Sequence, residues 1–303
     1  MGHGVGQRRR DTSAVPIPLD KPIPAGRWTL ATGPTFMMTR RVFAKTVAAG
    51  MAMAAGPLRA RSKLNIGIGT FSYHNLSIDE MIVQLNALRI KEIEMSRGEF
   101  MLFSNPDSHL FRSTREKLDR AGICCVSYYT ATIKDGHEVD SAVRFATLLG
   151  ARNITGDATG NTLAEIDRRF TREGITFGIH NHYFKGQKFP YESPEDVLNA
   201  LAGVSRTIGA TADVGQFASC GYDPVDAIRK LAPRLKLVHL KDVQARDGEV
   251  NVLLGTGICK IPEVMRELRR QNFHGLVAVE YEKEGPAEDD VRHEVEFARK
   301  LAG

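Results

Sequence analysis

The chain has 303 residues, 42% of them hydrophobic and 25% charged, which allows one large α/β domain or two small ones with a sizeable core. Its net charge of +5 is unevenly spread: residues 1–62 hold ten Lys or Arg against two Asp, leaving 31 Lys or Arg against 34 Asp or Glu in residues 63–303. A mildly acidic body argues against a protein that binds the phosphate backbone of nucleic acids.

The first 62 residues differ in composition from the rest. Residues 1–36 are rich in Pro, Gly and Arg without an apolar period, and we expect them to be disordered. Residues 37–62 contain Arg40-Arg41, then Phe43 and Lys45, then a short Ala/Gly/Met-rich apolar stretch. This pattern resembles a twin-arginine export signal and predicts a periplasmic protein that contacts the membrane only through an uncleaved signal. An amphipathic N-terminal helix is the alternative.

From residue 63 onward, short apolar runs alternate with segments of helical period. The predicted strands are 64–69, 91–96, 123–129, 152–156, 175–181, 208–214, 235–241 and 276–281, and the clearest helices are 77–88, 194–201, 223–232 and 261–271. Eight β-then-α units in about 240 residues predict a single (β/α)₈ TIM barrel over 63–303. A doubly wound open sheet is the alternative, but GIGTFSY (67–73) is not the Gly-rich phosphate loop that it would normally carry.

The four cysteines do not form a recognisable framework. We expect the adjacent Cys124 and Cys125 to lie in the core, and a pairing of Cys220 with Cys259 is left open. Neither a disulfide scaffold nor a Cys-x-x-Cys zinc site is indicated.

Polar side chains stand at the C-terminal ends of several predicted strands, where TIM barrels hold their chemistry. They are Glu94, His180, His182, Asp213, His239, Lys241, Asp242 and Glu280. In GIHNHYF (178–184), His180 and His182 share one face of the strand, because side chains two residues apart point the same way. Two such imidazoles can bind a metal, flank a substrate, or serve as hydrogen-bonded core groups.

Four consecutive strands end in side chains that can ligate a metal. His180, Asp213, His239 and Glu280 offer two nitrogens and two carboxylates. This set suits Zn²⁺, Mn²⁺, Co²⁺ or Fe²⁺ better than Ca²⁺. The sequence therefore predicts one divalent metal ion at the C-terminal mouth of the barrel.

Residues 63–303 resemble the xylose isomerase-like TIM-barrel family, the sugar phosphate isomerase/epimerase group that also includes inosose dehydratases, ketose 3-epimerases, hydroxypyruvate isomerases and the endonuclease IV branch. The resemblance is carried by GIHNH (178–182), ADVGQF (212–217), VHLKDV (238–243), LGTGICKIPEV (254–264) and VAVEYE (277–282). It implies metal ligation by the four residues named above. It also implies that Glu94, His182 and Lys241 contact or approach the substrate.

Two positions depart from the family pattern. Epimerases of this family often carry a Glu where this chain has His180, so a symmetric shuttle between two carboxylates is in doubt. The endonuclease branch carries a His where this chain has Gln216, which argues against a three-metal nuclease site.

The chemistry that this resemblance implies is proton abstraction beside a carbonyl. Glu280 is the predicted base, and Lys241 and His182 are predicted to polarise or protonate substrate oxygens. The structural alternatives are an ion pair of Lys241 with Asp242 or Glu282, and Glu94 as an acceptor for loop amides. For Asp242 we expect a structural role.

The loop before 192–201 brings Tyr183, Phe184 and Tyr191 near the same mouth, where aromatic rings stack on a sugar or simply pack. Ser193 and Asp196 are expected to cap the following helix.

Without a phosphate-binding loop, the predicted substrate is a small non-phosphorylated sugar. The first hypothesis is a metal-dependent isomerase or epimerase that acts on a keto-sugar or related polyol through an enediolate. The alternatives are a lyase or dehydratase acting on a keto-sugar or cyclitol, and a sugar-binding barrel without catalysis. A homo-oligomer is possible.

Overall fold

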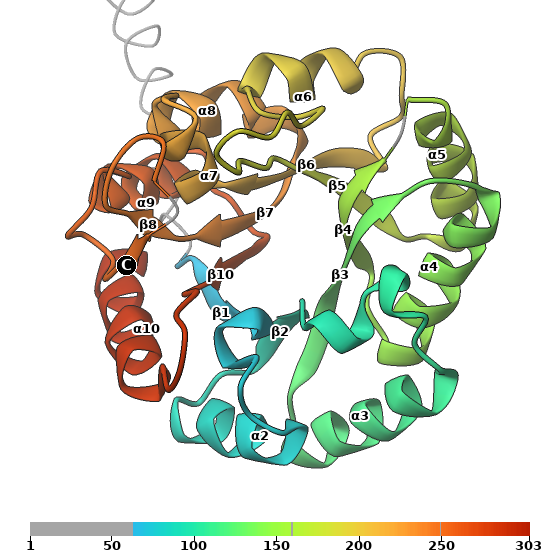
Figure 1. Ribbon diagram of the computed structural model, residues 1–303, viewed down its shortest axis with the longest axis horizontal. Helices are drawn as coiled ribbons and strands as arrows, with labels where there is room; N and C mark the ends of the chain where they lie inside the picture. Colours follow the sequence, from blue (N-terminus) through green and yellow to red (C-terminus); the bar gives the residue numbers. More distant parts are fainter. Residues whose placement is uncertain (1–62, 159, 249) are drawn as a thin grey trace, which may run out of the picture. The chain divides into compact units, whose positions relative to one another are not determined.

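The computed structural model describes residues 63–158, 160–248 and 250–303. The predicted extension (1–36) and signal (37–62) lie outside these residues. Within the described part, eight parallel strands form a closed barrel in the order β1-β10-β7-β6-β5-β4-β3-β2 (Figure 1). Because β1 pairs with both β10 and β2, the sheet has no open edge, and the doubly wound alternative is wrong.

The strands agree closely with the segments predicted from the apolar runs. They are β1 Asn65–Gly69, β2 Glu92–Met95, β3 Cys124–Ile133, β4 Asn153–Ala158, β5 Thr176–His180, β6 Ile208–Asp213, β7 Leu235–Leu240 and β10 Leu276–Val279. The main difference is in the middle of the chain, where β3 and β4 each extend beyond the predicted end. A short antiparallel ribbon, β8 Asp242–Val243 with β9 Asn251–Val252, follows β7.

Helices surround the barrel (Figure 1). They are α2 Ile78–Ala87, α3 Ser108–Ala121, α4 Gly136–Leu149, α5 Thr162–Glu173, α6 Pro194–Ala200, α7 Val214–Ser219, α8 Pro224–Leu231, α9 Ile261–Arg270 and α10 Glu288–Ala302. The predicted cap of α6 is confirmed, since Ser193 and Asp196 exchange both bonds of a capping box. Gly122 and Gly174 end α3 and α5 in the left-handed conformation that glycine adopts without strain.

The core is continuous between the barrel and its helices, as expected for parallel strands buried on both faces. Every residue of β6, for example, is buried. Gly178 on β5 is required by this packing, because a Cβ there would lie 2.1 Å from Thr211 Oγ1 on β6. No helix in the described ranges combines the length and apolar character needed to cross a bilayer.

The cysteines correct one expectation. Cys125 is buried as predicted, but Cys124 is exposed, because alternate residues at the start of β3 face opposite sides and its side is open to solvent. All four cysteines are free, so Cys220 and Cys259 are not paired.

Candidate metal centre

The four predicted ligands lie at the C-terminal ends of four neighbouring strands. His180 ends β5, Asp213 ends β6, His239 lies one residue before the end of β7, and Glu280 follows β10 directly. These strands are adjacent in the barrel in this order. In the strand register Asp213 lies beside His239, which in turn lies beside Ala278, two residues before Glu280. The regular β/α alternation therefore places all four side chains at one mouth.

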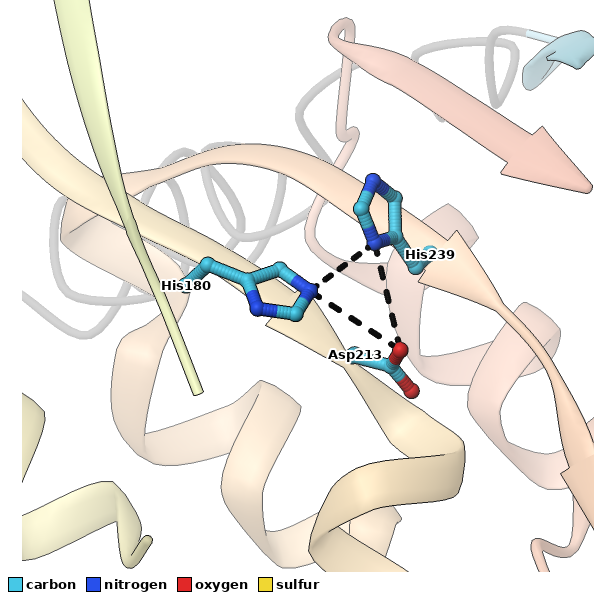
Figure 2. A group of neighbouring side chains, drawn as sticks. All are labelled: His180, Asp213 and His239. Atoms are coloured by element: carbon cyan, nitrogen blue, oxygen red, sulfur yellow. Dashed lines mark hydrogen bonds and ion pairs between the residues drawn. The ribbon is translucent and has the colours of Figure 1, made fainter. Parts of the chain in front are cut away.

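Three of these side chains converge on a common point. One ligand atom from each of His180, Asp213 and His239 lies within 4.8 Å of the other two (Figure 2). His180 Nε2 is 3.0 Å from His239 Nδ1, and Asp213 Oδ2 is 3.8 Å and 3.9 Å from these nitrogens. Glu280 Oε2 lies 2.9 Å from His239 Nδ1, so the fourth predicted ligand adjoins the group through His239.

These residues fit a divalent cation. Tetrahedral coordination with bonds of about 2.1 Å places ligand atoms about 3.4 Å apart, close to the spacing observed here. Asp213 Oδ2 and Glu280 Oε2 are buried and accept no hydrogen bond within the described structure, although Lys241 and His239 lie at ion-pair distance. Buried acceptors without a hydrogen bond are unfavourable unless a cation compensates them. The donor set is suited to zinc, manganese, cobalt or iron.

His239 is fixed from behind by Glu94. His239 Nε2 bonds the Glu94 carboxylate, whose other oxygen accepts a bond of 2.8 Å from Ser127. Glu94 has no exposed surface and lies outside the lining of the cavity described below. The structure thus places Glu94 beneath His239, away from the predicted substrate position, and gives it side-chain partners in place of loop amides. A carboxylate behind a ligating imidazole orients the ring and strengthens the ligand.

The two imidazoles of the group have opposite pKa shifts. Burial, reinforced by His182 and His239, holds the pKa of His180 well below 6.5, so this ring is neutral. Burial also opposes the charged form of His239, but the carboxylates of Glu280 and Glu94 outweigh it and hold that pKa well above 6.5. The carboxylates therefore favour the protonated form of His239, and a metal ion bound at Nδ1 would replace the proton there.

Asp213 is positioned by its neighbours in sequence and in the sheet. Its Oδ1 accepts the Gln216 backbone N–H at 2.9 Å, which begins α7. The Asn181 side chain bonds both the N–H and the C=O of Asp213. Asn181, which lies between the two histidines of GIHNH, thus links the end of β5 to β6 by two hydrogen bonds, while both histidines line the cavity.

Lys241 is buried among carboxylates. Its Nζ lies 2.7 Å from Glu282 Oε1, 3.2 Å from Asp213 Oδ2 and 3.8 Å from Glu280 Oε1. The ion pair with Glu282 that the sequence offered as an alternative is present, and the one with Asp242 is not. Burial opposes the charge of Lys241, but Asp213, Glu280 and Glu282 outweigh it and hold the Lys241 pKa well above 10.5.

Asp242 has the structural role that we expected. Its carboxylate accepts backbone N–H groups of Gly255, Gly257 and Cys259 at 2.9–3.0 Å, and so anchors the LGTGIC loop beside β7. A Cβ at Gly257 would lie 2.3 Å from Asp242 Oδ1, so only glycine fits this position.

A cavity of about 450 Å³ opens over the group. His180, His239, Lys241, Glu280 and Glu282 form its polar side. The lining also includes the apolar or aromatic side chains Phe71, Met101, Phe103, Tyr129, Ala131, Phe184 and Phe189, and the polar side chains Ser96, Thr132, Asp157, His182 and Gln216. A cavity of this size, with few polar groups on one side, suits a small organic ligand.

His182 lies on the cavity wall beside the metal-binding group. Its Nε2 bonds the Tyr129 hydroxyl at 2.8 Å, and its ring packs against Phe184 and Phe189. Burial lowers the pKa of His182, so the ring is neutral. Phe184 reaches the cavity as the sequence suggested, whereas Tyr191 is buried and donates to Ala158 O at 3.0 Å.

The sequence reasoning missed Tyr129 and Asp157 on the cavity wall. Tyr129 was counted as the last residue of an apolar strand. Asp157 was placed one residue beyond the predicted fourth strand, although β4 continues to Ala158. An acidic residue directly after a barrel strand was the available signal.

Comparison with known proteins agrees with this geometry. Residues 157–301 match the family model described as the xylose isomerase-like TIM barrel. The match covers just under half of the chain, and it likens this part of the TIM barrel to that family. The matched segment contains all four predicted ligands and begins at Asp157.

The chain is also similar to a curated protein, the rhizopine catabolism protein MocC of Rhizobium meliloti. The two are 25% identical over 144 residues, which is 42% of this chain and 43% of that protein. The match therefore spans less than half of the relative's length.

Solved structures share the fold over most of their length. An uncharacterised Parabacteroides distasonis protein is 26% identical with a TM-score of 0.60, covering 79% of this chain and 99% of that one. A D-tagatose 3-epimerase-like protein is 17% identical with a TM-score of 0.64, covering 78% and 96%. The IOLI protein, solved with a bound zinc atom, is 14% identical with a TM-score of 0.64, covering 80% and 98%. The last two likenesses show the fold alone.

Proposed function

We propose that this barrel is a divalent-metal-dependent isomerase or epimerase of a non-phosphorylated keto-sugar or related polyol. The observation that carries the proposal is the convergence of His180, Asp213 and His239, with Glu280 alongside, beneath a cavity of sugar size. The names of similar proteins point the same way, since they include a D-tagatose 3-epimerase-like protein and a zinc-bound barrel.

His180, Asp213, His239 and Glu280 would hold the metal ion. When bound, such an ion supplies Lewis-acid stabilisation of negative charge that develops on substrate oxygens. The protein's own groups then move the protons.

Glu280 is the group that we assign as base. Burial raises its pKa, but the positive charges of Lys241 and His239 outweigh burial and hold the pKa well below 4.5, so the carboxylate is ionised. It would take the proton from the substrate carbon next to the carbonyl; the electron pair of that C–H bond forms a C=C bond, and the π pair of the carbonyl moves onto its oxygen. Returning the proton to the neighbouring carbon completes an isomerisation, and returning it to the opposite face of the same carbon completes an epimerisation.

Lys241 is charged and stands on the cavity wall, where it donates a hydrogen bond to the oxygen that becomes negative. We expect Lys241→Met to retain metal and to lower kcat by about 10²–10⁴-fold. Lys230→Met, which removes an exposed ion pair, is the matched control. Metal content and steady-state kinetics are measured for each variant, and full metal content with lowered kcat would support Lys241 as the hydrogen-bond donor to the substrate. Loss of metal along with activity would instead assign Lys241 to holding the site together.

A lyase is the second candidate. His180 stands where related epimerases often carry a carboxylate, so the fifth strand lacks the acid that would be paired with Glu280 to return a proton to carbon. In a lyase, Lys241 would protonate the leaving hydroxyl group after Glu280 has taken the α-proton, and water would depart. Both reactions use the same groups up to the second proton transfer.

One experiment separates these activities. The 63–303 barrel is analysed for metal and incubated with a panel of ketohexoses and cyclitols in D₂O. An isomerase or epimerase introduces deuterium at carbon without changing the composition of the substrate, whereas a lyase forms a product lighter by one water. Bound sugar without either change indicates a binding protein, and a barrel that cannot be loaded with metal contradicts the proposal.

We also propose that residues 37–62 direct export to the periplasm by the twin-arginine route. The support is the Arg40-Arg41 pair ahead of a short apolar stretch. Replacing both arginines by lysine is expected to leave the full-length chain in the cytoplasm, as measured by cell fractionation. Unchanged fractionation would contradict this proposal.

A further inference from the structure

Asp157 is a buried carboxylate in the cavity that the proposed chemistry does not use. It lies on β4, is 6% exposed and contributes to the cavity lining. Its Oδ1 has no hydrogen-bond partner, and no ion pair to Asp157 occurs among the described residues. Lys241, the charged lysine of the same cavity, is engaged by Glu282 and Asp213.

A structural role does not account for this arrangement. A buried carboxylate oxygen without a hydrogen bond costs free energy relative to the same group in water. Asp242, in contrast, shows what a structural carboxylate looks like in this fold, since three backbone amides saturate its oxygens. Asp157 is among the residues that line the cavity, and its Oδ1 is buried there without a hydrogen-bond partner in the described structure.

A second polar atom with the same property lies just after the next strand, β5. His182 Nδ1 is buried and has no hydrogen-bond partner among the described residues, while Nε2 of the same ring is bonded to the Tyr129 hydroxyl. β4 and β5 are adjacent, with Gly156 beside Ile179 in register, and Asp157 and His182 both belong to the lining of the cavity. Phe184 and Phe189 pack against His182 and add an apolar surface for the C–H face of a ring.

We propose that Asp157 and His182 together hold one hydroxyl group of the substrate and thereby select which polyol is accepted. The hydroxyl donates its hydrogen to Asp157 Oδ1 and accepts a hydrogen bond from Nδ1–H of His182. The Tyr129 hydroxyl fixes the required tautomer by donating to Nε2. Asp157 is thus a substrate-binding residue that does not belong to the metal-binding group, and this role rests on the proposed sugar function.

The test measures whether Asp157 recognises one particular hydroxyl. Wild type, Asp157→Ala and Asp157→Asn are loaded with metal and titrated calorimetrically with the ketohexose or cyclitol that wild type binds best, and with each of its monodeoxy analogues. Asp140→Asn, which removes an exposed carboxylate paired with Arg169, is the control. Metal content and thermal unfolding are recorded for every variant.

We expect Asp157→Ala to keep its metal and to bind the parent polyol at least about tenfold more weakly, because a charge-assisted hydrogen bond is lost. One monodeoxy analogue should bind wild type equally weakly, and Asp157→Ala should not distinguish that analogue from the parent. Asp157→Asn, which keeps an acceptor of the same shape, should lie between. If Asp157→Ala does not fold, the comparison of Asp157→Asn with wild type tests the proposal instead.

A uniform loss of affinity for the parent and all its analogues, or no loss, would overturn the role of Asp157 while leaving the proposed function intact. A metal-loaded wild type that binds no member of the panel would overturn both. The two failures are therefore distinguishable in one set of titrations.

Discussion

The two parts of the chain that line the cavity differ in character. The lining residues before Asp157 are uncharged: Phe71, Ser96, Met101, Phe103, Tyr129, Ala131 and Thr132. Every carboxylate, lysine and imidazole of the lining lies at or after Asp157. The family match begins at the same residue and ends at 301.

The charged part of the lining and the uncharged part have different requirements. A metal site and its bases tolerate little variation in residue type or position, because ligand number and distance are fixed by the ion. The opposite wall needs only to fit the ligand, and many combinations of apolar side chains achieve this. The segment that matches the family thus holds the groups for the proposed reaction, and the segment outside the match supplies part of the surface that the proposed sugar substrate would contact.

The largest expected effect comes from removing a ligand on the charged side. Asp213→Asn and His239→Ala should each abolish retention of metal and with it turnover, because each takes one donor from a buried group of three. Metal bound per chain after dialysis, measured by elemental analysis, tests this expectation.

The controls for the ligand variants are Asp140→Asn and His137→Ala, which change exposed side chains of the same types. They should retain metal like wild type. Full metal content in both ligand variants would show that the site lies elsewhere.

The sequence predicted the charged side much better than the uncharged side. His180, Asp213, His239 and Glu280 are visible because polar groups that end apolar strands are unusual, and strand order alone brings them together. Tyr129 could not be assigned to the cavity in this way. An aromatic residue in an apolar strand usually belongs to the core, and only the structure shows that its ring faces the cavity. The position of Glu94 beneath His239 also depends on side-chain depth, which a one-dimensional pattern does not contain.

Glu294 is a buried carboxylate outside the cavity, and unlike the acids of the metal-binding group it has no positively charged partner among the described residues. Glu294 on α10 is 1% exposed, and one of its oxygens accepts the Leu254 N–H at 2.9 Å, while the other has no hydrogen-bond partner within the described chain. Burial raises the pKa of Glu294 to about 8, against the opposing effect of the Leu254 amide. The folded protein therefore binds a proton between about pH 4.5 and pH 8 that the unfolded chain does not.

The stability contributed by this site should fall as pH rises through that window, and Glu294→Gln should remove the dependence. The raised pKa sets an upper bound of about 5 kcal/mol, and we expect on the order of 2–3 kcal/mol. Denaturant unfolding of wild type and Glu294→Gln at pH 5 and pH 9 gives the difference. Parallel stability curves for the two proteins would contradict this account.

A smaller effect is expected at Glu94, which belongs to the charged group but not to the cavity. Glu94→Gln weakens the bond behind His239, and such outer partners typically change metal affinity by about 10–100-fold. At saturating metal the KM for substrate should stay close to that of wild type. A raised KM with unchanged metal affinity would restore the substrate contact that the sequence predicted for Glu94.

The smallest effect should come from the uncharged wall. Phe103 lines the cavity and is 69% exposed, so most of its ring surface is accessible to a ligand. Phe103→Ala should raise KM by roughly fivefold, the equivalent of about 1 kcal/mol of aromatic contact, with kcat and metal content unchanged. Val83→Ala removes an equally exposed apolar side chain outside the cavity and should change neither constant. A fall in kcat at Phe103 with constant KM would mean that the uncharged wall takes part in the reaction itself, and the division between the two parts of the chain would no longer hold.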